Sequence, residues 1–242
     1  MAVGTRPLVP SRLAPSRRSD GRETGLVHGT RRAPRTVVGG YIALTKPRII
    51  ELLLITTLPA MVMAERGWPS WGLIVTTLIG GTLAAGGANA INMYVDRDID
   101  RLMERTASRP LVTGLIAPRN ALVFALVLEV LAFGVLWGFA NLLAAVLAVS
   151  ATGFYVFIYT LWLKRTSRQN IVIGGAAGAM PVLVGWAAVT NSLGWAPVLL
   201  FLMIFWWTPP HFWALAIRYA DDCRAAGVPM LPALVPPRVA VR

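Results

Sequence analysis

The sequence predicts an all-α protein whose helices cross a membrane, and three observations support this fold class. Of the 242 residues, 56% are hydrophobic and only 14% are charged, whereas an ordinary soluble domain has about 25% charged residues. The mean hydropathy is +0.61. Six apolar segments recur along the chain, and most approach the roughly 20 residues with which a helix crosses a bilayer. We therefore expect a polytopic transmembrane helical bundle.

The chain begins with a basic segment and continues with the six predicted spans. Residues 1–40 are rich in Arg, Pro, Ser and Gly and lack the apolar core of a secretory signal. We expect a disordered cytoplasmic tail there; the alternative is an organellar transit peptide, which the prolines disfavour. Turn signals separate the spans, which we place at about 49–64, 71–95, 120–139, 141–163, 171–190 and 195–217.

The basic residues are distributed unevenly between the two sides of the predicted bundle. With six crossings, 22 of the 23 Lys and Arg residues fall on the side of the N-terminus, and Arg66 is the exception. The positive-inside rule places that side in the cytoplasm or in an equivalent matrix. This rule explains the net charge of +12, so we expect a lipid bilayer and no nucleic acid as partner. The lone Cys223 excludes an internal disulfide and a thiolate metal cluster.

Residues 89–110 carry the strongest chemical signal. Asn92, Asp96 and Asp100 recur every four residues, so on a helix their oxygen atoms line one face. Mg²⁺ is usually held by one or two carboxylates together with substrate phosphates. Guanidinium groups suit phosphate oxygens, and four arginines lie in the same stretch: Arg97, Arg101, Arg105 and Arg109. The alternative interpretation is a solvated loop with helical ion pairs.

A second acidic cluster follows the sixth predicted span. Asp221 and Asp222 lie there, and spans two and six both run toward the N-terminal side. The two clusters thus face the same compartment, where they are suited to hold a Mg²⁺–diphosphate between them. The intramembrane residues Glu51, Glu129 and His211 are weaker signals. Glu51 lies near Lys46 and Arg48 and is as compatible with pairing there as with a functional role. Glu129 fits helix packing as well as a cavity-facing role, and His211 fits packing as well as a role as ligand or catalyst.

The motifs together resemble the UbiA superfamily of intramembrane prenyltransferases, and within it the protohaem IX farnesyltransferases (haem O synthases). The resemblance covers about residues 41–232. It rests on Lys46-Pro47-Arg48 with Glu51, Asn92-x₃-Asp96-x₃-Asp100, Arg109-Pro110-Leu111, Tyr159-Thr160, Leu163-Lys164-Arg165, the Asn170–Ala179 stretch, Trp207–Trp213, Asp221-Asp222 and the Ala226–Pro232 stretch.

This resemblance implies transfer of a farnesyl group from farnesyl diphosphate to a vinyl carbon of haem B, which is a substrate rather than a cofactor. It implies Mg²⁺ as the cofactor and points forward to a haem A synthase as a possible partner. It also implies the following roles: metal binding for Asn92, Asp96, Asp100, Asp221 and Asp222; catalysis for Asp96, Asp100 and His211; and substrate binding for Arg105, Arg109, Lys164, Arg165 and Tyr94.

Two departures from the family pattern matter. The second motif reads Asp-Asp instead of Asp-x₃-Asp, which favours the haem branch over enzymes of quinone precursors. The family has nine spans, whereas this chain provides six, followed by an atypical tail at 233–242. The expected domain at 41–232 therefore lacks the C-terminal helices of the family, and a truncated product is one explanation.

Other functions stay open at this point. Within the enzyme class, the alternative is a UbiA-type prenyltransferase that acts on an aromatic ring. A transporter would also use intramembrane acids and a proline-broken helix, but it would not need two aspartate clusters on one side. A non-catalytic assembly factor leaves the aspartate spacing unexplained. We expect the cell membrane as the location, with the mitochondrial inner membrane as the alternative.

Overall fold

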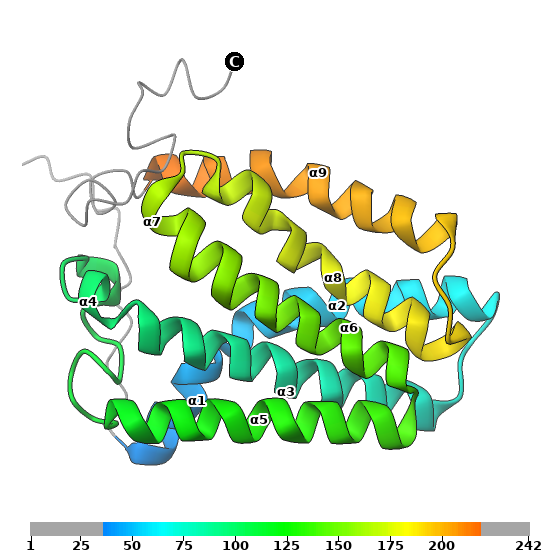
Figure 1. Cartoon of the computed structure of the whole chain (residues 1–242), viewed down its shortest axis with the longest axis horizontal. Helices are drawn as coiled ribbons and strands as arrows, with labels where there is room; N and C mark the ends of the chain where they lie inside the picture. Colours follow the sequence, from blue (N-terminus) through cyan, green and yellow to red (C-terminus); the bar gives the residue numbers. More distant parts are fainter. Residues whose placement is uncertain (1–35, 219–242) are drawn as a thin grey trace, which may run out of the picture. The chain divides into compact units, whose positions relative to one another are not determined.

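The computed structural model describes residues 36–218, and for residues 214–218 it describes the backbone alone. Within this range the chain is helical, without strands, as predicted (Figure 1). The elements are α1 (Val37–Thr45), α2 (Pro47–Glu65), α3 (Trp71–Val95), α4 (Arg97–Asp100), η1 (Glu104–Thr106), α5 (Pro118–Phe139), α6 (Leu142–Gly153), η2 (Phe154–Leu163), α7 (Lys164–Thr166), α8 (Asn170–Thr190) and α9 (Trp195–Arg218). Residues 1–35 of the tail predicted at 1–40 lie outside the described residues, as do Asp221 and Asp222. The predicted disorder is wrong for residues 37–40, because they belong to α1.

The predicted spans correspond closely to the long helices. Five stretches of the described chain are long and apolar enough to cross a membrane: Val37–Glu65, Trp71–Val95, Pro118–Phe139, Leu142–Thr166 and Asn170–Thr190. Helix α9 matches the sixth predicted segment with 24 residues. The largest difference lies at the first span, which begins before residue 49 because α1 precedes α2 and only Lys46 separates them.

Local sequence explains where the helices begin and end. Side chains of Thr36, Ser70 and Asn141 accept hydrogen bonds from the first-turn backbone N–H groups of α1, α3 and α6, which satisfies donors that a helix start leaves unpaired. Arg66 and Asn191 end α2 and α8 in the left-handed conformation. These caps produce the short links that the turn signals predicted.

Helix α3 lies at the centre of the bundle. It packs most extensively against α5 and also contacts α1, α2, α6, η2 and α8. A side chain at Gly87 would come within 3.0 Å of the backbone oxygen of Ala125 and closer still to Glu129. The glycine therefore permits the close approach of α3 and α5, as small residues commonly do between membrane helices.

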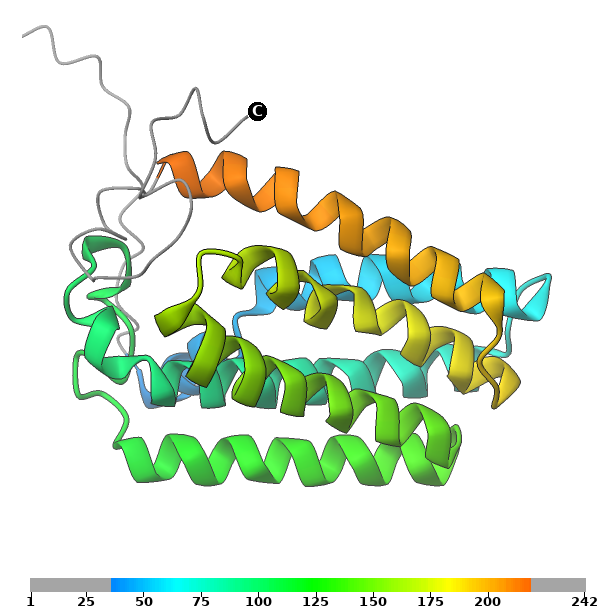
Figure 2. The ribbon, with the colours of Figure 1, turned by 45° about the horizontal axis from the view of Figure 1, so that its top comes forward.

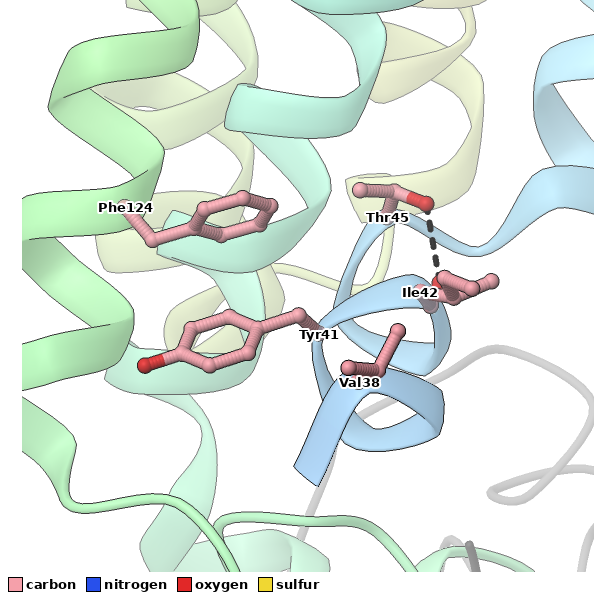
Figure 3. A pocket seen from close by; sticks show the side chains of 5 residues that line it. All are labelled: Val38, Tyr41, Ile42, Thr45 and Phe124. Carbon is pink, nitrogen blue, oxygen red and sulfur yellow. Dashed lines mark hydrogen bonds between the residues drawn. The ribbon is translucent and has the colours of Figure 1, made fainter. Parts of the chain in front are cut away.

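Helix α1 is fastened to the α5 side of the bundle by aromatic packing. The rings of Tyr41 and Phe124 lie 4.9 Å apart between centroids, and together with Val38, Ile42 and Thr45 they line an apolar pocket of about 390 Å³ (Figure 3). The hydroxyl of Thr45 donates a hydrogen bond to the Ile42 carbonyl at 2.8 Å. These contacts fix the end of α1, from which the chain turns into α2.

The helix ends alternate between the two ends of the bundle. The long link from α3 to α5, the turn at α7 and the end of α9 lie together, whereas the short links between α2 and α3, α5 and α6, and α8 and α9 lie at the opposite end (Figures 1 and 2). The first group contains most of the basic residues of the described chain. The arrangement agrees with the predicted alternation, and the side of the membrane stays a prediction.

Candidate functional site

The predicted acidic face forms where α3 ends. Backbone hydrogen bonds of 2.9 Å join Asp96 N to Asn92 O and Asp100 N to Asp96 O, so the helical turn continues from α3 through α4. Asn92, Asp96 and Asp100 are 3%, 0% and 2% exposed, whereas the side chain of the intervening Asp98 is 58% exposed. The prediction that the three residues share one face is confirmed, and this face is buried.

Cationic side chains from distant parts of the chain meet the two buried acids. Lys164 Nζ lies 2.5 Å from Asp96 Oδ2, and Arg165 Nη2 lies 3.8 Å from Asp96 Oδ1. Arg109 pairs with Asp100 Oδ2. Three of the predicted substrate-binding residues thus lie at the acidic face, where they balance carboxylates that would be costly to bury alone.

Asn92 connects this cluster to two further residues. Its Oδ1 accepts a hydrogen bond from Lys46 Nζ at 2.8 Å. Its Nδ2 donates to Asp96 Oδ2 at 2.7 Å and to Thr160 Oγ1 at 3.2 Å. Thr160 in turn donates to the backbone oxygen of Tyr155 at 2.8 Å. The amide of Asn92 is therefore held by partners on both of its polar atoms.

The helix opposite α3 has an unusual form at this level. Residues Phe154–Leu163 make a ten-residue π-helix, a rare form that is found frequently at functional sites. It carries Thr160 and leads directly into Lys164, and its Tyr155 and Tyr159 rings stack with centroids 5.4 Å apart. A Cβ at Gly174 of α8 would lie 2.3 Å from the Tyr159 ring, so this glycine makes room for the stacked pair.

The exposed Asp98 has a different partner. Both of its carboxylate oxygens accept hydrogen bonds of 2.8 Å from the Arg165 guanidinium. The hydrogen bond from Arg165 lowers the pKa of Asp98 to about 2. Arg165 therefore bridges the outer acid and the buried Asp96.

The residues present fit a divalent cation. Among the described residues, no donor hydrogen-bonds to Asp96 Oδ1, although the atom is buried. Arg165 Nη2 lies 3.8 Å from this oxygen, beyond hydrogen-bond distance, and a buried anionic oxygen without a hydrogen-bond donor favours a closer cation. The neighbouring oxygens of Asn92 and Asp100 are the hard ligands that Mg²⁺ prefers. The described chain offers no cluster of three His, Cys, Asp or Glu ligands, so the set would combine one amide with two carboxylates.

The remaining predicted residues lie in other surroundings. The Arg97 guanidinium lies over the Tyr94 ring, 4.6 Å from its centroid. Arg105 is exposed on η1. His211 is exposed on α9, where its ring stacks on Trp207 with centroids 4.4 Å apart. Their assigned roles stay predictions.

Comparison with known proteins identifies the family. The sequence profile of the UbiA prenyltransferase family matches residues 53–242. The chain belongs to this family. This UbiA family chain is 57% identical over 221 residues to the "Protoheme IX farnesyltransferase" of Mycobacterium sp. (strain KMS), covering 91% of the chain and 71% of that relative. It is 59% identical over 201 residues to the protein of the same name from Clavibacter michiganensis subsp. michiganensis (strain NCPPB 382), covering 83% and 65%.

Solved structures place the UbiA family chain in the same fold. A UbiA homolog from Archaeoglobus fulgidus bound to DMAPP and Mg²⁺ superposes with a TM-score of 0.68 at 20% identity, covering 83% of this chain and 71% of that one. The same homolog bound to GPP and Mg²⁺ gives a TM-score of 0.66. The described helices therefore have the UbiA arrangement, and the predicted fold class is confirmed.

Sequence reasoning left Lys46 and Thr160 of this UbiA family chain without a role at the site. For Lys46 a signal existed, because a basic residue before a proline interrupts an otherwise apolar stretch. Thr160 gave no such signal, since a threonine in an apolar helix usually satisfies its hydroxyl on its own backbone. Only the contact with Asn92 reveals its position in the site.

Proposed function

We propose that this protein transfers a farnesyl group from farnesyl diphosphate to a vinyl group of haem B and so produces haem O. Relatives named protoheme IX farnesyltransferase share 55–59% identity with the chain. The observation that carries the proposal is the buried face of Asn92, Asp96 and Asp100, surrounded by cationic side chains. Such a face suits a metal–diphosphate group, whereas charged side chains are costly to bury in a helix that is merely packed.

The reaction begins when the bond between C1 of the farnesyl group and the diphosphate oxygen breaks. A Mg²⁺ ion, when bound, would neutralise charge on the departing diphosphate. Asn92, Asp96 and Asp100 are the residues that would hold it, and Asp221 and Asp222 belong to the proposal as a second set. Arg109, Lys164 and Arg165 lie close enough to that face to bind diphosphate oxygens, and Arg105 is a further candidate.

The farnesyl cation then attacks the terminal vinyl carbon of haem B. Water adds to the other vinyl carbon and loses a proton, which leaves the hydroxyethylfarnesyl side chain of haem O. Aromatic faces stabilise a nearby carbocation, and we propose this role for Tyr155 and Tyr159, whose rings stack 5.4 Å apart, with Tyr94 as another candidate. His211 is a candidate for haem or proton handling.

The chain is a multi-pass membrane protein, and we propose the cell membrane, with the N-terminal basic side in the cytoplasm. The mitochondrial inner membrane is the alternative. Since haem O is a precursor that a further oxidation converts to haem A, a haem A synthase is a fitting partner.

Pigment analysis tests this function. Membranes that contain the chain are supplied with haem B, farnesyl diphosphate and Mg²⁺, and haems are extracted and separated. We expect haem O, and we expect its loss when a chelator removes the divalent cation. Prenylation of an aromatic ring without haem O would favour the other UbiA-type reaction. Solute flux that needs neither Mg²⁺ nor a prenyl diphosphate would favour a transporter.

A further inference from the structure

The orientation of the Asn92 amide leaves one of its atoms for a cation. Its Nδ2 donates to Asp96 and to Thr160, and Thr160 has already given its own proton to the Tyr155 carbonyl, so Thr160 can only accept. The amide nitrogen is therefore fixed on that side. Oδ1 is the only side-chain oxygen that Asn92 has for a metal ion.

Lys46 occupies that oxygen. Its Nζ donates a hydrogen bond to Asn92 Oδ1 at 2.8 Å. An amide oxygen that accepts a hydrogen bond from a lysine is a poor ligand for a divalent cation, because both cationic groups would have to approach the same atom.

The backbone holds Lys46 in this position. The residue has φ 56° and ψ 63°, a left-handed conformation that is uncommon for a residue with a side chain, and it precedes Pro47, which further restricts it. Such strain persists only where the surroundings enforce it, and it gathers at functional sites.

The surroundings of Lys46 on both sides are well anchored. Asn89, one turn before Asn92 on α3, donates from Nδ2 to the Thr45 carbonyl at 3.0 Å. The end of α1 is also packed through Tyr41 against Phe124, as Figure 3 shows. Two asparagines of α3 thus hold the link between α1 and α2. Asn89 bonds the backbone oxygen of Thr45, and Asn92 bonds the side chain of Lys46.

We propose that Lys46 competes with the divalent cation for Asn92 Oδ1. The metal then binds tightly only when a bound diphosphate accepts the hydrogen bond of Lys46 in place of Asn92. The inference rests on the proposed function, since it takes Asn92 as a metal ligand. It implies positive coupling between metal and diphosphate, and such coupling is reciprocal. Without diphosphate, Lys46 stays bonded to Asn92 Oδ1 and the metal binds weakly.

The experiment measures Mn²⁺ binding to the purified chain in detergent, by electron paramagnetic resonance of free Mn²⁺, with and without inorganic diphosphate. In Lys46→Met we expect Mn²⁺ without diphosphate to bind about tenfold more tightly than in the wild type, within the usual 5- to 150-fold range of such coupling. We also expect diphosphate to increase Mn²⁺ affinity less in Lys46→Met than in the wild type. Lys46→Gln is a second variant, and thermal unfolding confirms that each protein is folded.

Arg97→Met is the matched control for charge. Arg97 lies between Asn92 and Asp100 in the chain. Its guanidinium lies over the Tyr94 ring and donates a hydrogen bond to the Tyr94 backbone oxygen. We expect less than about a threefold change in Mn²⁺ affinity, because a screened, indirect charge acts weakly. Equal effects of the two variants would overturn the inference, since general electrostatics would then suffice. Unchanged or weaker Mn²⁺ binding by folded Lys46→Met or Lys46→Gln would overturn it as well.

Failure of the proposed function gives a different result. If Asp96→Asn binds Mn²⁺ with diphosphate as tightly as the wild type, the metal assignment of the acidic face is wrong, whatever Lys46 does. If Lys46→Met gains Mn²⁺ affinity while the wild type makes no haem O, the competition stands and the reaction assignment fails.

Discussion

Residues 92–100 form one helical stretch, and its two faces carry aspartates that differ in burial and in their ion-pair partners. Asp96 and Asp100 are buried and paired with Lys164 and Arg109. Asp98 lies between them in the chain, yet its side chain is 58% exposed and its partner is the half-exposed Arg165. The three residues have the same chemistry, and helical phase alone separates the two buried ion pairs from the surface ion pair.

Burial determines how strongly each of these carboxylates interacts with a cation. A buried carboxylate loses its water and retains only the partners that the fold provides, so its interaction with a cation is strong. An exposed pair is screened by water and salt and contributes little. If this contrast is the reason why the site forms on one face, substitutions on the two faces will have effects of very different size.

The largest effect is expected for Asp96→Asn or Asp100→Asn. Either change removes a buried negative charge that we assign to the divalent cation, and loss of one preorganised electrostatic group typically costs 10²–10³-fold in rate. We expect haem O formation to fall by at least about a hundredfold. The measurement is the rate of haem O formation in membranes at saturating Mg²⁺.

Membrane insertion serves as the control for both variants. We expect each protein to reach the membrane in normal amounts, since the buried lysine or arginine partner gains an amide oxygen in place of a carboxylate. Near-normal turnover in either variant would remove the metal role from that aspartate and with it the contrast between the two faces.

The fold and the acidic face were predictable because both follow from periodicity. The apolar segment at 71–95 coincides with α3, since a membrane helix must satisfy its backbone internally and cannot be interrupted. The spacing of Asn92, Asp96 and Asp100 then fixes one face by helical geometry alone. The burial of that face agrees with the same phase, because charged side chains avoid lipid.

The partners of that face were not predictable in the same way. Lys46 reaches Asn92 across 46 positions, and Thr160 reaches it across 68; no local pattern encodes such contacts. The π-helix at Phe154–Leu163 also has no signature in hydrophobic spacing. Gly174 and Gly178 form a Gly-x-x-x-Gly step, but of these two only Gly174 would bring a Cβ against a neighbour, the Tyr159 ring.

A smaller effect is expected for Lys164→Met. The change removes the hydrogen bond to Asp96 and a group that we assign to diphosphate oxygens. We expect KM for farnesyl diphosphate to rise by about tenfold to a hundredfold, in line with 1.5–3 kcal/mol for a charge-assisted hydrogen bond. Steady-state kinetics with varied farnesyl diphosphate measure it.

Lys164→Arg separates charge from geometry. It keeps the positive charge but replaces a compact ammonium with a planar group, so we expect only partial recovery of KM. A Lys164→Met protein with unchanged KM would show that the lysine serves only to neutralise Asp96, and the buried face would then be structural on this side.

The paired glycines of α8 extend the contrast to packing. In Gly174→Ala the new Cβ would lie 2.3 Å from the Tyr159 ring, whereas Gly178 has nothing within 4 Å. Overpacking costs about 1–3 kcal/mol, so we expect Gly174→Ala to lower the thermal unfolding temperature and to reduce activity by displacing Tyr159.

Gly178→Ala is the matched control on the same helix. Alanine is favoured over glycine inside a helix by about 0.8–1.0 kcal/mol, so we expect an unchanged or slightly raised unfolding temperature. The two variants are compared by thermal unfolding in the same detergent. Equal destabilisation would mean that α8 and η2 do not approach as closely at Gly174 as the structure shows.

The smallest effect is expected for Asp98→Asn. Its charge is exposed, and we expect haem O formation at pH 7 to stay within about twofold of the wild type, as for other exposed pairs.

Because Arg165 lowers the pKa of Asp98 to about 2, the folded protein retains this charge below the pH at which an unfolded chain would protonate it. Any stabilisation from the pair is therefore present above about pH 4 and disappears as the pH falls toward 2. The difference in unfolding temperature between wild type and Asp98→Asn should narrow over that range. A loss of activity as large as that of Asp96→Asn would place Asp98 in the reaction itself and would mean that burial does not select the functional acids of this stretch.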